Sequence, residues 1–388
     1  MSPPVTTNAE ASSRRARRSL RANVVIVGAG PAGLGMARVL RDLAVPDVRI
    51  VERERVGASF RRWPEDMRFI SPSFTGNAFG LTDLNAISFD SSPAFALKRE
   101  HPSGADYARY LDQAVEIFGL NVTTGVDVRG LEPDGDDIAL HTDAGEIRAR
   151  FVIWAAGQFQ YPSDGDIPGA EHGVHSGSMR RWSDFAGDEA IVIGGYESGI
   201  DAAIGLAAAG KCVTVLSRSA AWDRNDTDPS VSLSPYTRDR LETARSGGRI
   251  TLVGDADILG LERTSGTIQV LAADGRSWTA SSAPILATGF AGSTRLIDDW
   301  FDFDDDGCPA VTAQDESTRL PGLFLVGPEL KHRGHLFCFI YKFRQRFAVV
   351  GRAIAGRLGI DTAPLEAYRA NTMYLDDLSC CDIDTCRC

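Results

Sequence analysis

The sequence has no long apolar run and no excess of basic residues. No uncharged apolar stretch approaches the ~18 residues that a membrane-spanning helix needs, and the longer ones are short segments such as Phe151–Gly157. Lys and Arg number 41 against 52 Asp and Glu, a formal net charge of −11, which disfavours a large surface for nucleic-acid phosphates. We therefore expect a protein that binds no nucleic acid and has no membrane span.

Paired cysteines are missing from most of the chain. Cys212, Cys308 and Cys338 are far apart in the sequence, and scattered cysteines are typical of the reducing cytoplasm, which is the location we expect. No Cys-x-x-Cys or Cys-x-x-x-x-Cys pair occurs in residues 1–379. The other four cysteines lie close together at the end of the chain: Cys380, Cys381, Cys386 and Cys388.

The chain has enough apolar material for more than one core. It has 388 residues, of which 43% are hydrophobic, and at about 150 residues per domain this length predicts two domains with additional tails. Residues 1–22 are rich in Ser, Thr, Pro and Arg, a composition that predicts a disordered basic tail. We expect the folded part to begin at residue 23.

A glycine-rich turn follows the first apolar run. Residues 23–27 have the pattern of a strand and residues 34–43 that of a helix. In such a turn the first glycine permits the tight bend, the second lets the backbone approach a pyrophosphate, and the third lets the helix pack on the sheet. The helix N-terminus favours phosphates, and an acid after the next strand can accept hydrogen bonds from a ribose. The predicted contacts are Gly28, Gly30, Pro31, Ala32, Gly33, Glu52 and Arg53.

The same pattern recurs in the middle of the chain. A strand at residues 190–193 precedes a second turn, an Ala-rich helix and a further strand. Tyr196 stands in the place of the second glycine, where a side chain should keep the backbone farther from a pyrophosphate. Arg218 follows the next strand in place of an acid, which suits a 2′-phosphate and predicts NADPH; the alternative is a vestigial domain kept for packing. The predicted contacts are Gly194, Tyr196, Ser198, Gly199, Ser217 and Arg218.

Two such units in one chain resemble the two-dinucleotide-binding flavoproteins, which include flavin-containing monooxygenases and pyridine nucleotide–disulfide oxidoreductases. Three further segments support the likeness. Phe151–Gly157 looks like the place where the chain leaves the FAD domain, Pro284–Phe290 like the place where it returns, and Leu320–Gly327 like the last strand that contacts FAD. The resemblance implies that FAD and NADPH are the cofactors.

The resemblance also implies an α/β fold with two Rossmann-like dinucleotide-binding domains. The NADPH-binding domain, residues 160–284, would be inserted into a discontinuous FAD-binding domain formed by residues 23–158 and 285–360. Residues 361–388 would form a Cys-rich C-terminal tail.

Further site residues follow from the same resemblance. Arg61, Arg62 and Trp63 would line the flavin pocket, although ordinary loop packing explains them nearly as well. His332 and His335 follow the last FAD strand at a position near the flavin in the relatives, and histidine titrates near neutral pH; they are either active-site groups or surface loop residues. The remaining contacts implied for the cofactors are Gly157, Thr288, Gly289 and Gly327.

The missing cysteine pair bears on the reaction. Reduced flavin can pass electrons to oxygen, which then oxygenates a nucleophile, or to a disulfide beside the ring. A redox-active cysteine is sometimes found within the first glycine turn, and Ala32 replaces it. We therefore expect an FAD-dependent, NADPH-consuming, monooxygenase-like enzyme that acts on a small nucleophilic substrate.

The C-terminal cysteines support alternatives. Leu378-Ser379-Cys380-Cys381 resembles the tail of mercuric reductases, where a vicinal pair captures a soft metal ion, and thiolates prefer such ions. Cys380 and Cys381 would then be catalytic in a thiol, disulfide or soft-metal reductase, and Cys386 and Cys388 would complete a metal site. A functionally incidental tail, a structural disulfide or a zinc site are the other interpretations, and a non-catalytic metal-binding flavoprotein is a third function.

Overall fold

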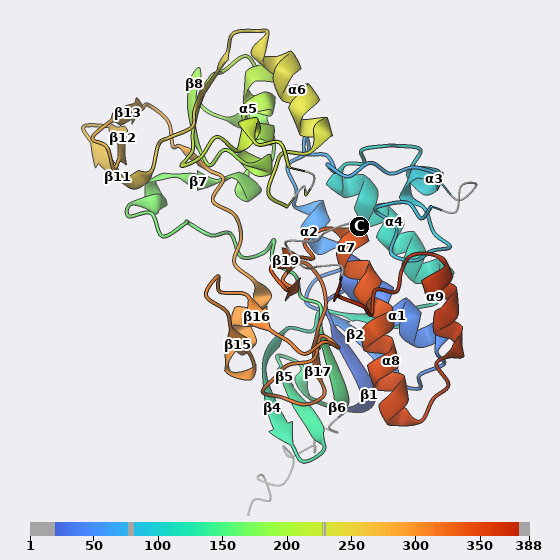
Figure 1. The fold of residues 1–388 in the computed structure, drawn as a ribbon. Helices are drawn as coiled ribbons and strands as arrows, with labels where there is room; N and C mark the ends of the chain where they lie inside the picture. Colours follow the sequence, from blue (N-terminus) through green and yellow to red (C-terminus); the bar gives the residue numbers. More distant parts are fainter. Residues whose placement is uncertain (1–19, 77–80, 227, 229, 380–388) are drawn as a thin grey trace, which may run out of the picture.

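The computed structural model describes residues 20–76, 81–226, 228 and 230–379. Within them the chain forms two units, one below the other in Figure 1, each built around its own sheet. The first unit contains both ends of the described chain, and the second contains its middle. The predicted insertion of one dinucleotide-binding unit into another therefore matches the order of the elements.

The sheet of the first unit combines parallel and antiparallel strands. Its members are β1 (Leu20–Val27), β2 (Val48–Glu52), β3 (Val122–Thr124), β4 (Val128–Asp134), β5 (Asp137–Thr142), β6 (Gly145–Trp154) and β17 (Leu323–Leu325). The order is β3-β2-β1-β6-β5-β4, and β17 pairs with the second half of β6. The pairs β3–β2, β2–β1, β1–β6 and β6–β17 are parallel, whereas β4, β5 and β6 run antiparallel.

The register of this sheet brings the carboxyl ends of its parallel strands together. Val27 of β1 lies opposite Val51 of β2 and Trp154 of β6, and Leu325 of β17 also pairs with Trp154. The segments that follow these strands, the first glycine turn among them, consequently begin at one edge of the sheet. In open α/β sheets this edge is where ligands bind.

Helices cover one face of this sheet. They are α1 (Pro31–Asp42), α2 (Ala58–Arg61), α3 (Pro93–Leu97), α4 (Gly104–Ile117), α7 (Ile340–Phe343), α8 (Phe347–Leu358) and α9 (Glu366–Ala370). Helices α1 and α8, far apart in the sequence, lie on the same side of the sheet in Figure 1. They meet where Phe347 fills the space beside Gly35: a Cβ on Gly35 would lie 2.3 Å from the Phe347 ring. Phe347 is fully buried in the core of this face.

The second unit has a smaller sheet with parallel strands only, in the order β10-β9-β8-β14-β7. These strands are β7 (Val174–His175), β8 (Glu189–Ile193), β9 (Cys212–Leu216), β10 (Ile250–Val253) and β14 (Ile285–Leu286). Its helices are α5 (Glu197–Ala208) and α6 (Pro235–Arg245). A separate antiparallel sheet contains β11 (Ile258–Thr264), β12 (Thr267–Ala272) and β13 (Ser277–Ala280). There are also two short hairpins in the described residues. One pairs β15 (Asp302–Phe303) with β16 (Pro309–Ala310), and the other pairs β18 (Lys331–His332) with β19 (His335–Leu336).

Two predicted boundaries are wrong. Strand β1 begins at Leu20, inside the predicted tail, because its first residues pair with β6: Leu20 lies opposite Ile147 and Ala22 opposite Ala149. Strand β14 belongs to the second sheet, where it pairs with β8 and β7, so the second unit extends beyond residue 284. In both places, pairing with a distant strand extends the unit beyond its local sequence pattern.

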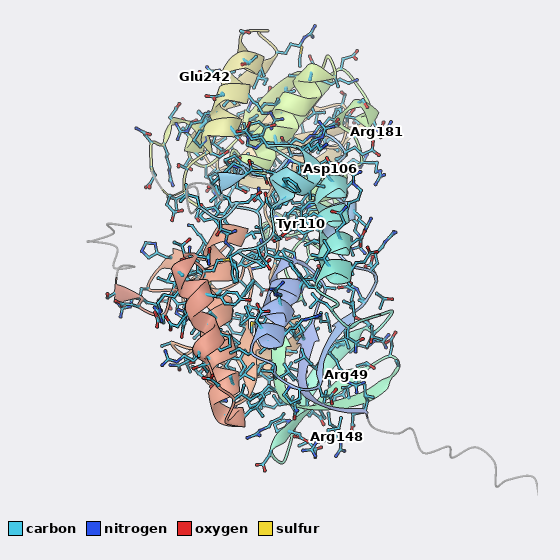
Figure 2. All side chains as sticks on the ribbon, turned by 90° about the vertical axis from the view of Figure 1, so that its right-hand side faces the viewer. Arg49, Asp106, Tyr110, Arg148, Arg181 and Glu242 are labelled. Carbon is cyan, nitrogen blue, oxygen red and sulfur yellow. The ribbon has the colours of Figure 1, made fainter. Side chains whose placement is uncertain are left out.

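Two linkers, residues 157–163 and 288–293, connect the units and run side by side. The backbone N–H of Ser163 donates to the carbonyl oxygen of Gly289 at 3.0 Å, and that of Ala291 donates to Tyr161 at 2.7 Å. Figure 2 shows Arg181 at the lower edge of the second unit, above Asp106 at the start of α4. Arg181 forms an ion pair with Glu65 of the first unit at 2.6 Å. The units therefore touch through side chains as well as through the linkers.

The contact between α1 and α8 gives a test of the fold. We expect Gly35→Ala to destabilise the protein by about 1–3 kcal/mol, because the buried ring of Phe347 has no room to move. The matched control is Gly356→Ala on α8, where no atom lies within 4 Å of the new methyl group; it should be neutral or raise stability by up to ~1 kcal/mol. Urea unfolding followed by circular dichroism measures both, and equal effects would contradict this packing.

Candidate functional site

A cavity of about 460 Å³ lies at the junction of the two units. The first unit lines it with the first glycine turn, the end of β2, and residues 154–161. The second unit contributes Ser176, Gly177 and the start of α5. The first glycine turn and the start of the helix that follows the second one thus face one space, whereas Gly194, Tyr196, Gly199, Ser217 and Arg218 do not line it.

The first glycine turn has the geometry that its sequence predicts. Gly28 has φ +106°, and a Cβ there would lie 2.5 Å from the carbonyl oxygen of Ala155. A Cβ on Gly33 would lie 2.0 Å from the carbonyl oxygen of Gly28, so only glycine lets α1 approach β1 this closely. Gly30 lines the cavity with no atom within 4 Å of its missing side chain. The N-terminal amides of α1 are therefore open to a pyrophosphate, and Pro31 and Ala32 line the same space.

The acid after β2 supports this turn. Glu52 lines the cavity, and its carboxylate accepts hydrogen bonds from the backbone N–H groups of Ala29 and Glu54, each at 2.9 Å. These bonds hold the carboxylate beside the turn, and each oxygen keeps a further lone pair for a ribose hydroxyl. Arg53 also lines the cavity. The residues present fit the adenosine diphosphate half of FAD.

Of the two neighbouring arginines predicted to line the flavin pocket, only one does. Arg61 forms an ion pair with Asp112 of α4 and is not among the residues that line the cavity. Arg62 lines it and pairs with Glu54. Trp63 lines the cavity as predicted. The difference arises because α2 is a short helix, on which neighbouring residues point in different directions.

Aromatic side chains form one wall of the cavity. Phe60, Trp63 and Phe69 contact one another with ring centroids 5.0–5.6 Å apart. Phe159 and Phe290 come from the two linkers and lie 4.9 Å apart. All five line the cavity. This wall suits a planar, largely apolar ring system.

The predicted residues of the linkers and of the last strand have different positions. Gly157 lines the cavity, but Thr288 and Gly289 bond instead to the other linker: the Thr288 hydroxyl donates to the Ser163 carbonyl at 2.5 Å. Gly327, with φ +113°, lies against Ala32 and turns the chain so that Pro328 lines the cavity.

Glu329 follows that turn and has a structural role. Its carboxylate accepts hydrogen bonds from the backbone N–H groups and hydroxyls of Ser293 and Thr294, at 2.6–3.1 Å. It therefore caps the helical segment that begins at Ser293.

The second glycine turn repeats the first with one change. Gly194 has φ +110°, and a Cβ on Gly199 would lie 1.9 Å from the Gly194 carbonyl oxygen. Tyr196 precedes α5, and its hydroxyl donates to the carbonyl oxygen of Ser232 at 2.9 Å. Trp222 covers the turn, since a Cβ on Gly195 would lie 2.4 Å from its ring. The turn is intact, but side chains cover part of it.

The residues predicted to select NADPH lie beyond β9. The Ser217 hydroxyl donates to the carbonyl oxygen of Ser219 at 2.8 Å, and Arg218 is exposed. An exposed arginine next to serine hydroxyls suits a 2′-phosphate. The role of Arg218 remains a prediction.

Two carboxyl groups on α5 were not predicted as site residues. Glu197 and Asp201 line the cavity together with the predicted Ser198. Glu197 accepts hydrogen bonds from the backbone N–H of Ser234 and from the Thr237 hydroxyl; burial raises its pKa, while these hydrogen bonds lower it. Their spacing of four residues, which places them on one face of the helix directly after the turn, was the available signal.

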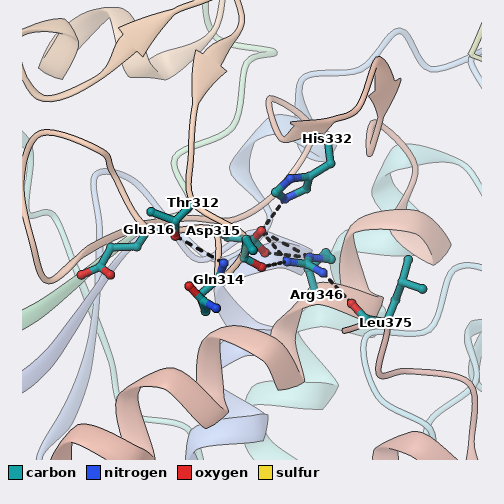
Figure 3. A network of polar contacts seen from close by, with 8 residues as sticks. Thr312, Gln314, Asp315, Glu316, His332, Arg346 and Leu375 are labelled. Carbon is teal, nitrogen blue, oxygen red and sulfur yellow. Dashed lines mark hydrogen bonds and ion pairs between the residues drawn. The ribbon is translucent and has the colours of Figure 1, made fainter. Parts of the chain in front are cut away.

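The predicted active-site histidines do not line the cavity. His332 of β18 is buried, and its Nε2 lies 2.6 Å from Oδ1 of Asp315 (Figure 3). Asp315 is fully buried and also accepts hydrogen bonds from Arg346, with Nη2 2.8 Å from Oδ1 and Nε 3.0 Å from Oδ2. Arg346 in turn donates to the carbonyl of Leu375. His335 lies on the partner strand β19. His332 thus belongs to a buried network that holds the C-terminal segment.

Cysteines are sparse around the cavity. Cys338 lines it, with its Sγ 3.2 Å from the Ser230 hydroxyl, and burial raises its thiol pKa. Cys212, Cys308 and Cys338 are free within the described residues. No group of three metal-binding side chains occurs there either. The predicted tail cysteines lie outside the described residues: Cys380, Cys381, Cys386 and Cys388.

Comparisons with known proteins agree with this architecture. The model of the pyridine nucleotide-disulphide oxidoreductase family matches residues 25–327. The ferredoxin–NADP reductase of Gluconacetobacter diazotrophicus is 28% identical over 358 residues, which cover 89% of this chain and 94% of that protein.

Two solved structures resemble the fold. The bacillithiol disulfide reductase of Staphylococcus aureus has a TM-score of 0.70 at 19% identity, and the flavin-containing monooxygenase of Stenotrophomonas maltophilia one of 0.66 at 17% identity. Each alignment covers 87% of this chain and 99% of the other. The predicted fold of two dinucleotide-binding units is thereby confirmed. Within the described residues, no helix is long and apolar enough to cross a membrane.

The open space at Gly30 gives a test of the first nucleotide site. We expect Gly30→Val to leave the unfolding temperature of the FAD-free protein nearly unchanged, because no atom lies near the new side chain. It should weaken FAD binding by about tenfold or more, since the side chain keeps a pyrophosphate from the backbone. Fluorescence titration with FAD measures the affinity, and wild-type affinity would contradict this placement. Gly33→Val should prevent folding, because its Cβ would overlap the Gly28 carbonyl.

The buried network gives a second test. Arg346→Met should lower the free energy of unfolding by about 3–5 kcal/mol, because it removes one partner of a fully buried ion pair. The control is Arg369→Met, which breaks a solvent-exposed pair with Asp376 and should have little effect. Chemical unfolding measures the free energy of unfolding of both variants. If both variants lost a similar amount, burial of the ion pair with Asp315 would not explain the effect of Arg346→Met.

Proposed function

Since the chain belongs to the pyridine nucleotide-disulphide oxidoreductase family and is an oxidoreductase that uses FAD and NADPH, we propose that the electrons of NADPH pass from the flavin directly to an acceptor in the cavity. No protein dithiol takes part. The observation that carries the proposal is the aromatic cavity between the first glycine turn and the start of α5, lined by one cysteine among the described residues. When bound, FAD supplies a carrier that accepts a hydride from NADPH and returns two electrons.

Different residues of the chain would bind FAD and NADPH. The amides after Gly28 and the carboxylate of Glu52 would bind the adenosine half of FAD, and the aromatic wall would exclude water from its ring system. The turn from Gly194 to Gly199 would bind the pyrophosphate of NADPH. A disulfide route normally needs two cysteines beside the ring, and Ala32 stands within the first turn where a redox-active cysteine is sometimes found.

The acceptor that we propose is oxygen, with a small nucleophile as second substrate. In the balanced reaction NADPH and a proton supply two reducing equivalents, one oxygen atom of O₂ is transferred to the nucleophile, and the other leaves as water. The cavity at the junction of the units has room for a small molecule beside the aromatic wall, and its apolar lining suits a thioether or a neutral amine.

A second candidate acceptor is a one-electron carrier protein. The relative from Gluconacetobacter diazotrophicus, which aligns along nearly its whole length, is named a ferredoxin–NADP reductase. Such a transfer also needs no dithiol. The alternative that uses the C-terminal cysteines as a thiol or soft-metal reductase remains a prediction from the sequence. The non-catalytic alternative is wrong, because the family consists of oxidoreductases.

Stoichiometry distinguishes the acceptors. We expect oxygen uptake by the holoenzyme with NADPH to rise when a thioether or amine is added, with one oxygenated product formed per NADPH oxidised. An oxygen electrode and mass spectrometry of the product measure this ratio. Fast anaerobic reduction of ferredoxin, with no oxygenated product in air, would favour the carrier protein instead.

A truncated chain provides the control for the tail. Removing residues 380–388 should leave this turnover unchanged, because direct transfer does not use the C-terminal cysteines. Loss of turnover in the truncated protein, with its FAD content intact, would support the thiol or soft-metal alternative.

A further inference from the structure

One arginine that lines the cavity has no acidic partner. Among the described residues of the cavity wall, three carry a positive charge: Arg53, Arg62 and Arg68. Arg53 and Arg62 both form ion pairs with Glu54. Arg68 is half-buried and forms no ion pair with any residue that the structure describes. Because a charge that is partly removed from water is costly without a partner, Arg68 is a candidate site for an anionic ligand.

The backbone around Arg68 holds its guanidinium by one nitrogen. Nη1 donates hydrogen bonds to the carbonyl oxygens of Glu65 at 2.7 Å and of Met67 at 2.8 Å. These bonds use both protons of Nη1, and within the described part of the chain Nε and Nη2 have no hydrogen-bond acceptor. Neither of these two nitrogens is buried. Their N–H groups are therefore accessible to a ligand.

The two free nitrogens form one edge of the guanidinium, which matches a carboxylate. Arg346 shows this geometry elsewhere in the chain, with Nε 3.0 Å and Nη2 2.8 Å from the two oxygens of Asp315. A carboxylate on such an edge accepts two parallel hydrogen bonds, which fix its orientation as well as its charge. Because the backbone already holds the guanidinium of Arg68, less side-chain freedom is lost when a ligand binds.

Arg68 lies close to the place where the two units face each other. It stands between Met67 and Phe69 in the sequence, and all three residues line the cavity. Asp201 of α5 lines the same cavity from the second unit, and the positive charge of Arg68 lowers its pKa. Asp201 nevertheless forms its ion pair with Arg240, at 2.8 Å. The free edge of Arg68 thus remains available near the junction of the units.

The pyrophosphates of the cofactors have other sites. Resting on the proposed function, they lie at the amides after Gly28 and at the turn from Gly194 to Gly199, and Arg68 belongs to neither turn. The remaining source of an anion is the substrate. We propose that Nε and Nη2 of Arg68 bind a carboxylate of the small nucleophilic substrate, so that the enzyme acts on a thioether or amine with a carboxylate at its other end. Arg68 is thus a specificity-determining residue.

A pair of ligands that differ in one charge tests this contact. 4-(Methylthio)benzoate and 4-(methylthio)benzamide share a thioether and a planar ring, but only the first carries a carboxylate. We expect the wild-type holoenzyme to bind the benzoate about 10- to 100-fold more tightly than the benzamide, as for hydrogen bonds between charged groups. In Arg68→Met this preference should fall at least about fivefold, because both donors are lost. Titration followed by the flavin absorption spectrum measures the dissociation constants.

Two further variants serve as controls. Arg68→Lys keeps the charge but loses the parallel donors, so its preference should be intermediate. Arg61→Met removes an arginine that pairs with Asp112 and does not line the cavity, and it should keep the wild-type preference. Flavin content and circular dichroism show whether each variant is folded; if Arg68→Met fails to bind FAD, Arg68→Lys decides. No preference in wild type, or an unchanged preference in the Arg68 variants, overturns the assignment.

A cofactor phosphate as the anion would give a different result. Isothermal titration of the same holoenzymes with NADP⁺ measures this alternative. We expect Arg68→Met to bind NADP⁺ with an affinity close to that of wild type. A loss of NADP⁺ affinity as large as the loss of benzoate affinity would assign Arg68 to the nucleotide and would overturn its role toward the substrate.

Failure of the proposed function would also look different. If the benzoate preference is present and is lost in Arg68→Met, but NADPH and air give no sulfoxide, the carboxylate site stands and oxygen is not the acceptor. If wild type and Arg68→Met convert both thioethers to sulfoxides with equal KM values, only the role of Arg68 fails.

Discussion

The close approach of a helix to a strand at each glycine turn is the constraint on which this structure depends. In the first unit Gly33 lies against the carbonyl of Gly28, and in the second Gly199 lies against Gly194, with room for no side chain at either place. Because the helix starts directly over the end of the strand, its unpaired amides face the ligand edge of the sheet. In each unit the backbone thereby presents helix N-terminal amides of the kind that suit a phosphate.

The chemistry depends on the place where the two sites meet. The units are joined by two paired linkers, and each linker contributes one aromatic residue, Phe159 or Phe290, to the shared cavity. The first unit contributes Phe60, Trp63 and Phe69 to the aromatic wall, and the second unit contributes two carboxyl groups, Glu197 and Asp201. A cavity that is apolar on one side and holds a few polar groups on the other suits transfer between two bound cofactors, since it excludes water and orients both.

Several polar residues near the site stabilise the fold instead of taking part in the reaction. Glu329 follows the last strand of the first sheet, but it caps the helical segment at Ser293. His332 and Arg346 surround the fully buried Asp315 and, through Leu375, hold the C-terminal segment. A buried charge with two partners is costly to disturb. These groups therefore fix the positions of the elements that surround the cavity.

The sequence by itself determined the features that depend on local spacing. The two glycine turns, the strands and helices beside them and Glu52 lie within short windows, where the conformation of each residue follows from its neighbours. Only the tertiary structure decided between Arg61 and Arg62, placed β14 in the second sheet, moved His332 out of the site, and brought Asp201 into it. Each of these outcomes depends on a partner distant in the sequence, as with Asp201 and Arg240 or Arg61 and Asp112. Local periodicity carries no information about such partners, because they meet only when the sheets and helices have packed.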